Sequence, residues 1–144
     1  MQGTILALAF RSPKGSAMHL SDSLGLTPID GVVEDYGSNK RRQISLLDEA
    51  AWDAACFDVG SKLPWYVRRA NVLVQGLNLK ELKGRIVQIG NVSIRILGEV
   101  TPCHVMDSVH AGLKKALESD WRGGVYGQIL VPGTIYVGDA IRAN

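Results

Sequence analysis

The chain has 144 residues, of which 46% are hydrophobic and 21% are charged, and its formal net charge is +2. This composition is typical of one folded domain with a hydrophobic core, and it excludes a largely disordered protein. The net charge is too small to indicate nucleic-acid binding, and no apolar run approaches the ~20 residues of a membrane span. Two cysteines are too few for a disulfide framework, so we expect a reducing, cytoplasmic location.

Short β-like runs separated by glycine and proline dominate the first half of the chain. In chain order, the apolar pattern predicts a strand over residues 3–10, a loop-rich segment over 19–40 and a strand over 41–47. The period then changes to that of an alanine-rich amphipathic helix over residues 45–57. Ser45 and Asp48 resemble the capping box of this helix.

The second half repeats this alternation of short strands and turns. It predicts a buried strand over 68–76, a capped turn over 78–84, a hairpin over 84–100, a helical stripe from Met106 to Leu117, and two or three strands over 123–144. The total is about seven or eight short, largely antiparallel strands with two or three helices. We therefore predict a mostly β (α+β) fold, a β-barrel with helical excursions, in a single domain over residues 1–144.

Cys103 lies where a β-branched run ends and a helical stripe begins. Thr101 and Pro102 precede it, and these residue types favour the cap and the first position of a helix. We therefore place Cys103 in the first turn of a helix, where the helix dipole can stabilise a thiolate. Burial as a small hydrophobic residue is the alternative for any cysteine.

The other candidate ligands near this thiol are weaker. Cys56 falls inside the alanine-rich helix, and we interpret it as a packing residue. His104 and His110 are six positions apart and point to different helix faces, without a fourth ligand nearby, so zinc is not favoured. Asp35 and Asp107 are the carboxylates that we consider for acid–base chemistry.

Basic residues gather at the ends of predicted elements. The three groups are Lys40, Arg41 and Arg42; Arg68 and Arg69; and Arg122, followed by Gly123 and Gly124. The planar guanidinium suits bidentate phosphate binding, and glycine N–H groups can cradle an anion. Solvated surface arginines are the alternative. Beside a placed cysteine, the three groups suggest one anionic ligand, and Asn71 could add hydrogen bonds to a polar heterocycle.

Four segments carry a wider pattern. They read KRRQISLLDEAAW, RRANVLVQGLNLKELKG, IGNVSIRILGEVTPCHVMD and WRGGVYGQILVPGTIYVGDAI. Their order and spacing resemble the MOSC domain, which is named for the C-terminal domain of molybdenum cofactor sulfurases. The resemblance extends from about residue 3 to residue 141 and implies a strand-rich, barrel-like fold. The chain resembles a compact stand-alone member of this family, so we expect no second catalytic domain and chemistry that is independent of pyridoxal phosphate.

The resemblance also implies a role for each motif. Cys103, at the end of the family's PC motif, would be the reactive cysteine, which carries a persulfide in some members and ligates molybdenum in others. The resemblance implies that the anionic pterin of the molybdenum cofactor (molybdopterin) is held by Arg41, Arg42, Arg68, Arg69, Asn71, Arg122, Gly123 and Gly124. Two positions depart from the family pattern: Glu34 replaces a glycine of the first loop, and Val100 replaces a possible second cysteine.

Three hypotheses follow from this combination. The first is a molybdenum-cofactor oxidoreductase that reduces N-hydroxylated compounds, with Cys103 as the metal ligand. Its electrons would come from a separate protein, because two cysteines cannot hold a four-cysteine iron–sulfur cluster. The second is a sulfur carrier or transferase with a persulfide on Cys103. The third is a module that holds or delivers the cofactor without turnover. The substrate and the oligomeric state stay open.

Overall fold

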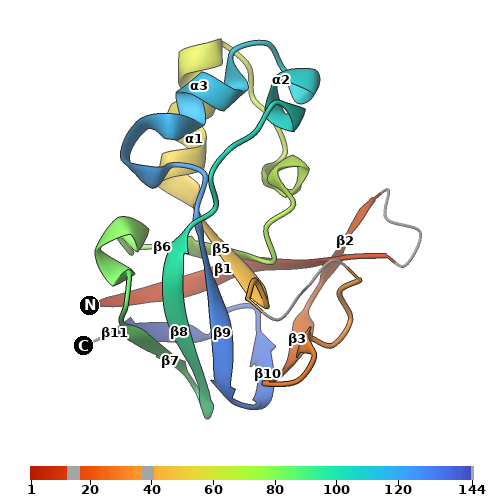
Figure 1. The fold of residues 1–144 in the computed structure, drawn as a ribbon, viewed down its shortest axis with the longest axis vertical. Helices are drawn as coiled ribbons and strands as arrows, with labels where there is room; N and C mark the ends of the chain where they lie inside the picture. Colours follow the sequence, from red (N-terminus) through yellow and green to blue (C-terminus); the bar gives the residue numbers. More distant parts are fainter. Residues whose placement is uncertain (13–16, 37–40, 144) are drawn as a thin grey trace.

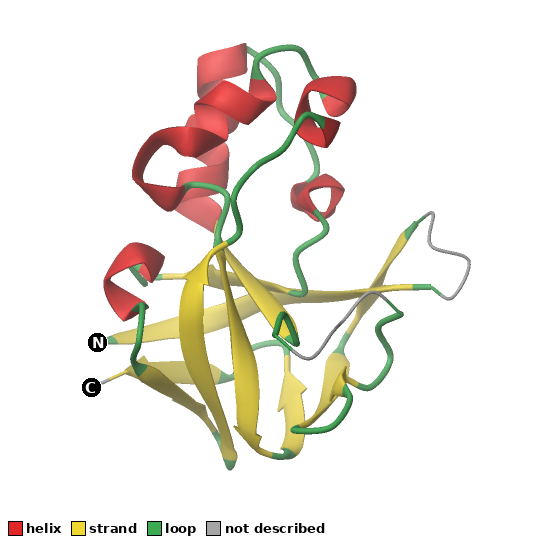
Figure 2. Cartoon of the chain, in the orientation of Figure 1, coloured by secondary structure: helices red, strands yellow, loops and turns green. Residues whose placement is uncertain are grey.

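The computed structural model describes residues 1–12, 17–36 and 41–143 (Figures 1 and 2). Lys40, one of the basic residues named above, lies outside these ranges. Strands make up most of the regular structure, and Figure 2 shows the helices gathered at one end of them. The predicted mostly β architecture with a few helices is therefore confirmed. No helix in the described ranges is long and apolar enough to cross a membrane.

Seven strands close into a barrel. In spatial order these are β11 (Ala140–Ala143), β7 (Ile86–Ile89), β8 (Val92–Glu99), β9 (Val125–Val131), β5 (Ile44–Asp48), β6 (Val72–Gln75) and β1 (Gln2–Arg11), and β1 pairs back to β11. All of these pairings are antiparallel except β5–β6, where Leu46 lies opposite Val72 in a parallel ladder. Closure buries one face of every strand, which explains the apolar alternation along β8.

Outside the barrel, β2 (Met18–Ser21) extends the sheet from β1, and β3 (Ser23–Thr27) lies between β4 (Gly31–Val32) and β10 (Gly133–Tyr136) in a second small sheet. The prediction of a loop-rich segment over residues 19–40 is therefore partly wrong. Leu24 and Leu26 alternate inward from β3 and are fully buried. The strand was hidden in the sequence because it is short and its partner β10 comes from the end of the chain.

A helical layer covers one end of the barrel (Figure 1). It contains α1 (Glu49–Val59), α2 (Val105–Val109) and α3 (Leu113–Glu118), with the short 3-10 helices η1 (Trp65–Arg68) and η3 (Ser119–Trp121). A third 3-10 helix, η2 (Leu79–Leu82), packs its leucines into the barrel core. A second core forms between α1, α3 and the sheet. Its largest buried side chain is Trp52, whose Nε1 donates to the Leu63 carbonyl oxygen at 3.0 Å. Cys56 is buried in this core, which confirms its role in packing.

Three local predictions about the helices need correction. Asp48 itself caps α1, because its carboxylate accepts from the Ala51 N–H at 3.0 Å, whereas Ser45 belongs to β5. Asn78 precedes η2 but forms no side-chain cap. The stripe after Cys103 is divided between α2 and α3, since the chain turns between them through Gly112 in the left-handed region (φ 87°).

Candidate functional site

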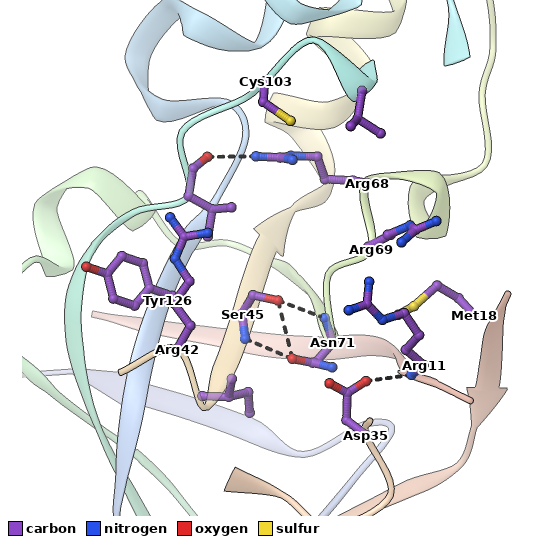
Figure 3. A pocket seen from close by; sticks show the side chains of 13 residues that line it. Arg11, Met18, Asp35, Arg42, Ser45, Arg68, Arg69, Asn71, Cys103 and Tyr126 are labelled. Atoms are coloured by element: carbon purple, nitrogen blue, oxygen red, sulfur yellow. Dashed lines mark hydrogen bonds between the residues drawn. The ribbon is translucent and has the colours of Figure 1, made fainter. Parts of the chain in front are cut away.

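A cavity of about 340 Å³ opens between the end of the barrel and the loops that lead to the helical layer (Figure 3). This volume lies in the range of small-molecule sites. Its polar lining includes Arg11, Arg42, Arg68, Arg69, Asn71 and Cys103. Four separate parts of the chain therefore meet at one cavity: the end of β1, the segment before β5, the η1 region and the segment after β8.

Cys103 presents its thiol at this cavity. The residue is exposed, and Figure 3 shows its sulfur on the side that faces Arg68. The predicted helical first turn is wrong in detail, because α2 begins at Val105 and Cys103 stands two residues before it, where its carbonyl accepts from the Met106 N–H at 3.0 Å. Exposure of the thiol, and not placement inside a helix, is what makes it accessible for chemistry.

Arg68 is a buried brace between the two chain segments beside this thiol. Its side chain is 9% exposed; Nε donates to the Gly123 carbonyl oxygen at 3.0 Å, and Nη2 donates to the Val100 carbonyl oxygen at 2.7 Å. Burial lowers the pKa of the Arg68 guanidinium, and the negative charge of an ionised Cys103 opposes that shift. Arginine remains protonated in proteins, so Arg68 places a fixed positive charge beside the cavity.

Gly123 leaves the room that this brace needs. A Cβ atom at this position would lie 2.8 Å from Arg68 Nη2 and 3.0 Å from the Val100 carbonyl oxygen. At the next position, a Cβ would collide with the Leu46 carbonyl oxygen, and Gly124 has a φ of 97°. The Gly124 N–H donates to the Trp121 carbonyl oxygen at 3.0 Å. The two glycines therefore serve close packing in this structure, and neither lines the cavity.

Asn71 forms part of the cavity wall with its amide already engaged. Its Oδ1 accepts from the Ser45 backbone N–H at 3.0 Å and from the Ser45 hydroxyl at 3.3 Å, while Nδ2 donates to the Ala9 carbonyl oxygen at 3.2 Å. The side chain is 5% exposed. It thereby joins β1, β5 and the residue before β6, and it fixes the shape of the wall from which the arginines project.

Tyr126 organises the arginines that precede β5. The guanidinium carbon of Arg42 lies 5.1 Å from the ring centroid, and that of Arg41 lies 5.8 Å from it. Arg41 Nε also donates to the Tyr126 hydroxyl at 3.2 Å. Cation–π contact of this kind restrains a guanidinium in one orientation. Arg42 reaches the cavity, whereas Arg41 is not part of its lining.

Arg11 and Arg69 line the opposite side of the cavity, next to Met18 (Figure 3). Within the described part of the chain, neither guanidinium has a hydrogen bond or an ion pair. Arg69 ends η1 in the left-handed region with φ 65°, a conformation that costs a residue other than glycine roughly 1–2 kcal/mol. The Arg11 backbone N–H donates to the Asp35 carboxylate at 2.5 Å, which places this acid in the same wall.

Arg122 lies away from the cavity. Its Nη1 donates to Asp58 Oδ2 at 2.6 Å and to the Ala116 carbonyl oxygen at 3.1 Å, so it joins α1 to α3. Of the residues predicted for the site, the structure brings together Arg42, Arg68, Arg69, Asn71 and Cys103. It leaves Arg41, Arg122, Gly123 and Gly124 outside the lining. Sequence reasoning missed Arg11, Met18 and Tyr126, which carry no motif and lie within or at the end of ordinary strands.

The sequence matches the model of the MOSC domain over residues 18–142. The chain belongs to the MOSC domain family. Its fold is similar to the crystal structure of the YuaD protein from Bacillus subtilis, with a TM-score of 0.84 and 20% identity over 98% of this chain and 94% of that chain.

Two further crystal structures agree in fold at lower identity. YiiM from Escherichia coli gives a TM-score of 0.73 at 14% identity, over 98% of this chain and 69% of that chain. YiiM from Geobacillus stearothermophilus gives 0.74 at 15%, over 99% of this chain and 75% of that chain. No curated protein sequence gave a significant match. At these identities the neighbours establish the shared fold.

The donors in this MOSC cavity fit an anionic ligand that brings its own metal ligands. The described residues hold no group of three or more His, Cys, Asp or Glu side chains that could bind a metal ion. Cys103 is thus the one thiol in a cavity lined by arginines, and it could supply only one protein ligand to a metal ion. A pterin dithiolene cofactor meets this condition, since it carries its own sulfur ligands and a phosphate, and arginine binds phosphate well.

Proposed function

We propose that this MOSC protein binds the molybdenum cofactor in the Cys103 cavity, with the Cys103 sulfur as the one protein ligand to molybdenum, and that it reduces N-hydroxylated compounds. The observation that carries this proposal is an exposed thiol that shares one cavity with four arginines. An isolated anion site would not need the thiol. An isolated metal site would need more protein ligands than this cavity offers.

When bound, the cofactor would supply two-electron chemistry: an N–O bond breaks, and R–NH–OH with two electrons and two protons gives R–NH₂ and water. The electrons would come from a separate electron-transfer protein. The chain itself binds, orients and shields. Arg42, restrained on Tyr126, and the fixed charge of Arg68 would attract the anionic end of the cofactor. The Arg68 brace holds the Cys103 segment in place against the Gly123 turn.

Sulfur transfer is the second candidate, and the exposure of Cys103 favours it. A persulfide carrier needs an accessible thiolate and no metal. Cys56, the second cysteine of the chain, is buried in the second core, whereas Cys103 is exposed. The Cys56 thiol is therefore not positioned to react with a persulfide on Cys103. Cofactor delivery without turnover uses the same cavity, and the experiment below separates it from catalysis.

The decisive measurement is the molybdenum content of protein purified from a host that makes the cofactor. Wild type should carry close to one molybdenum per chain, Cys103→Ala should lose most of it, and Cys56→Ala should retain it as the matched thiol control. Reduction of an amidoxime by the loaded wild type would establish catalysis, whereas loading without turnover would leave a delivery module. Molybdenum-free wild type with one extra sulfur atom on Cys103, seen by intact mass, would replace the proposal with sulfur transfer.

A further inference from the structure

We infer that Arg11 and Arg69 form a clamp for a carboxylate, and that the small molecules on which this site acts are carboxylic acids. The role of these acids as substrates rests on the proposed function, whereas the clamp is a property of the chain alone. Neither Arg11 nor the pairing of these two residues was visible in the sequence pattern.

The cavity has two cationic sides with different construction. On one side, Arg42 is stacked on Tyr126, and Arg68 is fixed by two backbone carbonyl oxygens. On the other side, Arg11 and Arg69 approach the cavity beside Met18 (Figure 3). Groups held in place before binding are suited to a ligand that stays, such as a cofactor. Among the described residues, none restrains the Arg11 or Arg69 guanidinium by a hydrogen bond or a ring contact of this kind.

In the described part of the chain, the Arg11 and Arg69 guanidinium groups form no ion pair, and Asp35 accepts from the Arg11 backbone and not from its side chain. Two like charges that line one cavity repel each other, and an anion bound between them would remove this repulsion. Arg69 also occupies a left-handed backbone position that glycine would adopt without strain, so the arginine there is not explained by the backbone.

The charge of this side matches a monoanion. Arg11 and Arg69 contribute two positive charges, and Asp35, the one acidic residue that lines the cavity in the described part of the chain, contributes one negative charge. The net charge of these three side chains is therefore +1. One carboxylate would neutralise it, whereas a phosphate dianion would leave a net negative charge. Planar carboxylates also match the planar guanidinium in bidentate geometry.

Apolar side chains extend the clamp toward the thiol. Met18 lies on the Arg11 side, and Val105, 40% exposed, follows Cys103 into α2. Both line the cavity. A ligand whose carboxylate sits between Arg11 and Arg69 would therefore lay an apolar body along these side chains and present its other end toward Cys103. Flat aromatic or short aliphatic acids have this form.

The test compares 4-carboxybenzamidoxime with its methyl ester by isothermal titration calorimetry on the purified chain. The two probes differ in the carboxylate and share the reducible group. We expect the acid to bind wild type and the ester to bind at least ~10-fold more weakly, the size of a lost charge-assisted hydrogen bond. Arg11→Met and Arg69→Met should each reduce acid affinity by ~10-fold or more and leave ester affinity unchanged. Arg95→Met, a remote exposed position on β8, should change neither.

Unchanged ester binding also shows that each variant is folded. Equal affinity for acid and ester in wild type would overturn the inference, as would a loss of molybdenum or phosphate binding in Arg11→Met with acid binding intact. Failure of the proposed function has a different signature: wild type without molybdenum that still distinguishes acid from ester would support the clamp and remove the reduction chemistry.

Discussion

Replacing Arg68 with methionine should loosen the two chain segments that meet beside the Cys103 thiol. The Gly123 and Val100 carbonyl oxygens would lose donors that now lie at 3.0 and 2.7 Å. Each hydrogen bond to a charged group contributes about 1.5–3 kcal/mol, and water from the cavity can replace part of this. We therefore expect the free energy of unfolding to fall by about 2–4 kcal/mol.

Urea unfolding of Arg68→Met and wild type measures this difference directly, and Arg95→Met is the control for loss of an exposed arginine. Gly123→Ala gives an independent check of the same contact. With Arg68 in place, the Cβ that Gly123→Ala introduces would lie 2.8 Å from Arg68 Nη2. Overpacking of this kind costs about 1–3 kcal/mol of stability. In the Arg68→Met background that atom is gone, so the two changes should couple by roughly 1 kcal/mol.

A loss below about 0.5 kcal/mol in Arg68→Met, the level of an ordinary surface change, would refute the brace. Strict additivity of Arg68→Met and Gly123→Ala would do the same, because residues that share no contact add independently. In either case Arg68 would be a ligand residue that happens to touch the backbone.

Two further changes probe the layer that supports the site. Trp52→Ala should lower the free energy of unfolding, measured in urea, by about 3–5 kcal/mol, because Trp52 is 2% exposed and its Nε1 donates to the Leu63 carbonyl oxygen. A loss below about 1 kcal/mol would mean that the second core is not packed as described. Burial raises the pKa of Asp48 above 3.8, against the lowering effect of the Ala51 N–H, so the folded state holds this proton more tightly than the unfolded state. The contribution of Asp48 is therefore complete below the unfolded pKa and is lost as the pH rises through the folded pKa. Relative to Asp48→Asn, which keeps an oxygen to cap α1, wild type should lose stability as the pH is raised from about 3 to about 7, and a relative gain would contradict the shift.

Local patterns predicted strands with a clear apolar run, such as β1, even where the partner strand is distant in the sequence. The hairpin of β7 and β8 was visible because Gly90 and Asn91 separate two β-branched runs, and the structure pairs Ile89 with Val92 across this turn. The second small sheet was not visible, since β3 has five residues and pairs with a strand from the other end of the chain. Short strands depend on tertiary contacts that no window of sequence contains.

The site divides in the same way. The family motifs led to Cys103 and Arg68, and both line the cavity. They did not reveal that Arg68 donates hydrogen bonds to two backbone carbonyl oxygens. An arginine that braces the backbone and an arginine that binds a ligand have the same sequence signal. Arg11 carries no motif, and Arg122 was predicted beside the ligand although Asp58, on α1, pairs with it elsewhere. Such partners are fixed only when distant elements pack together.

The pairing of β1 with β11 has a consequence for the order in which the protein forms during synthesis. The Met1 amino group donates to the Ala143 carbonyl oxygen at 3.0 Å, and the Ala143 N–H donates back to the Met1 carbonyl oxygen at 2.9 Å. Every cavity residue, from Arg11 to Tyr126, is translated before this seam can close. The barrel can therefore close only after residues 140–143 have emerged from the ribosome, which makes the last strand of the chain the one that completes the sheet.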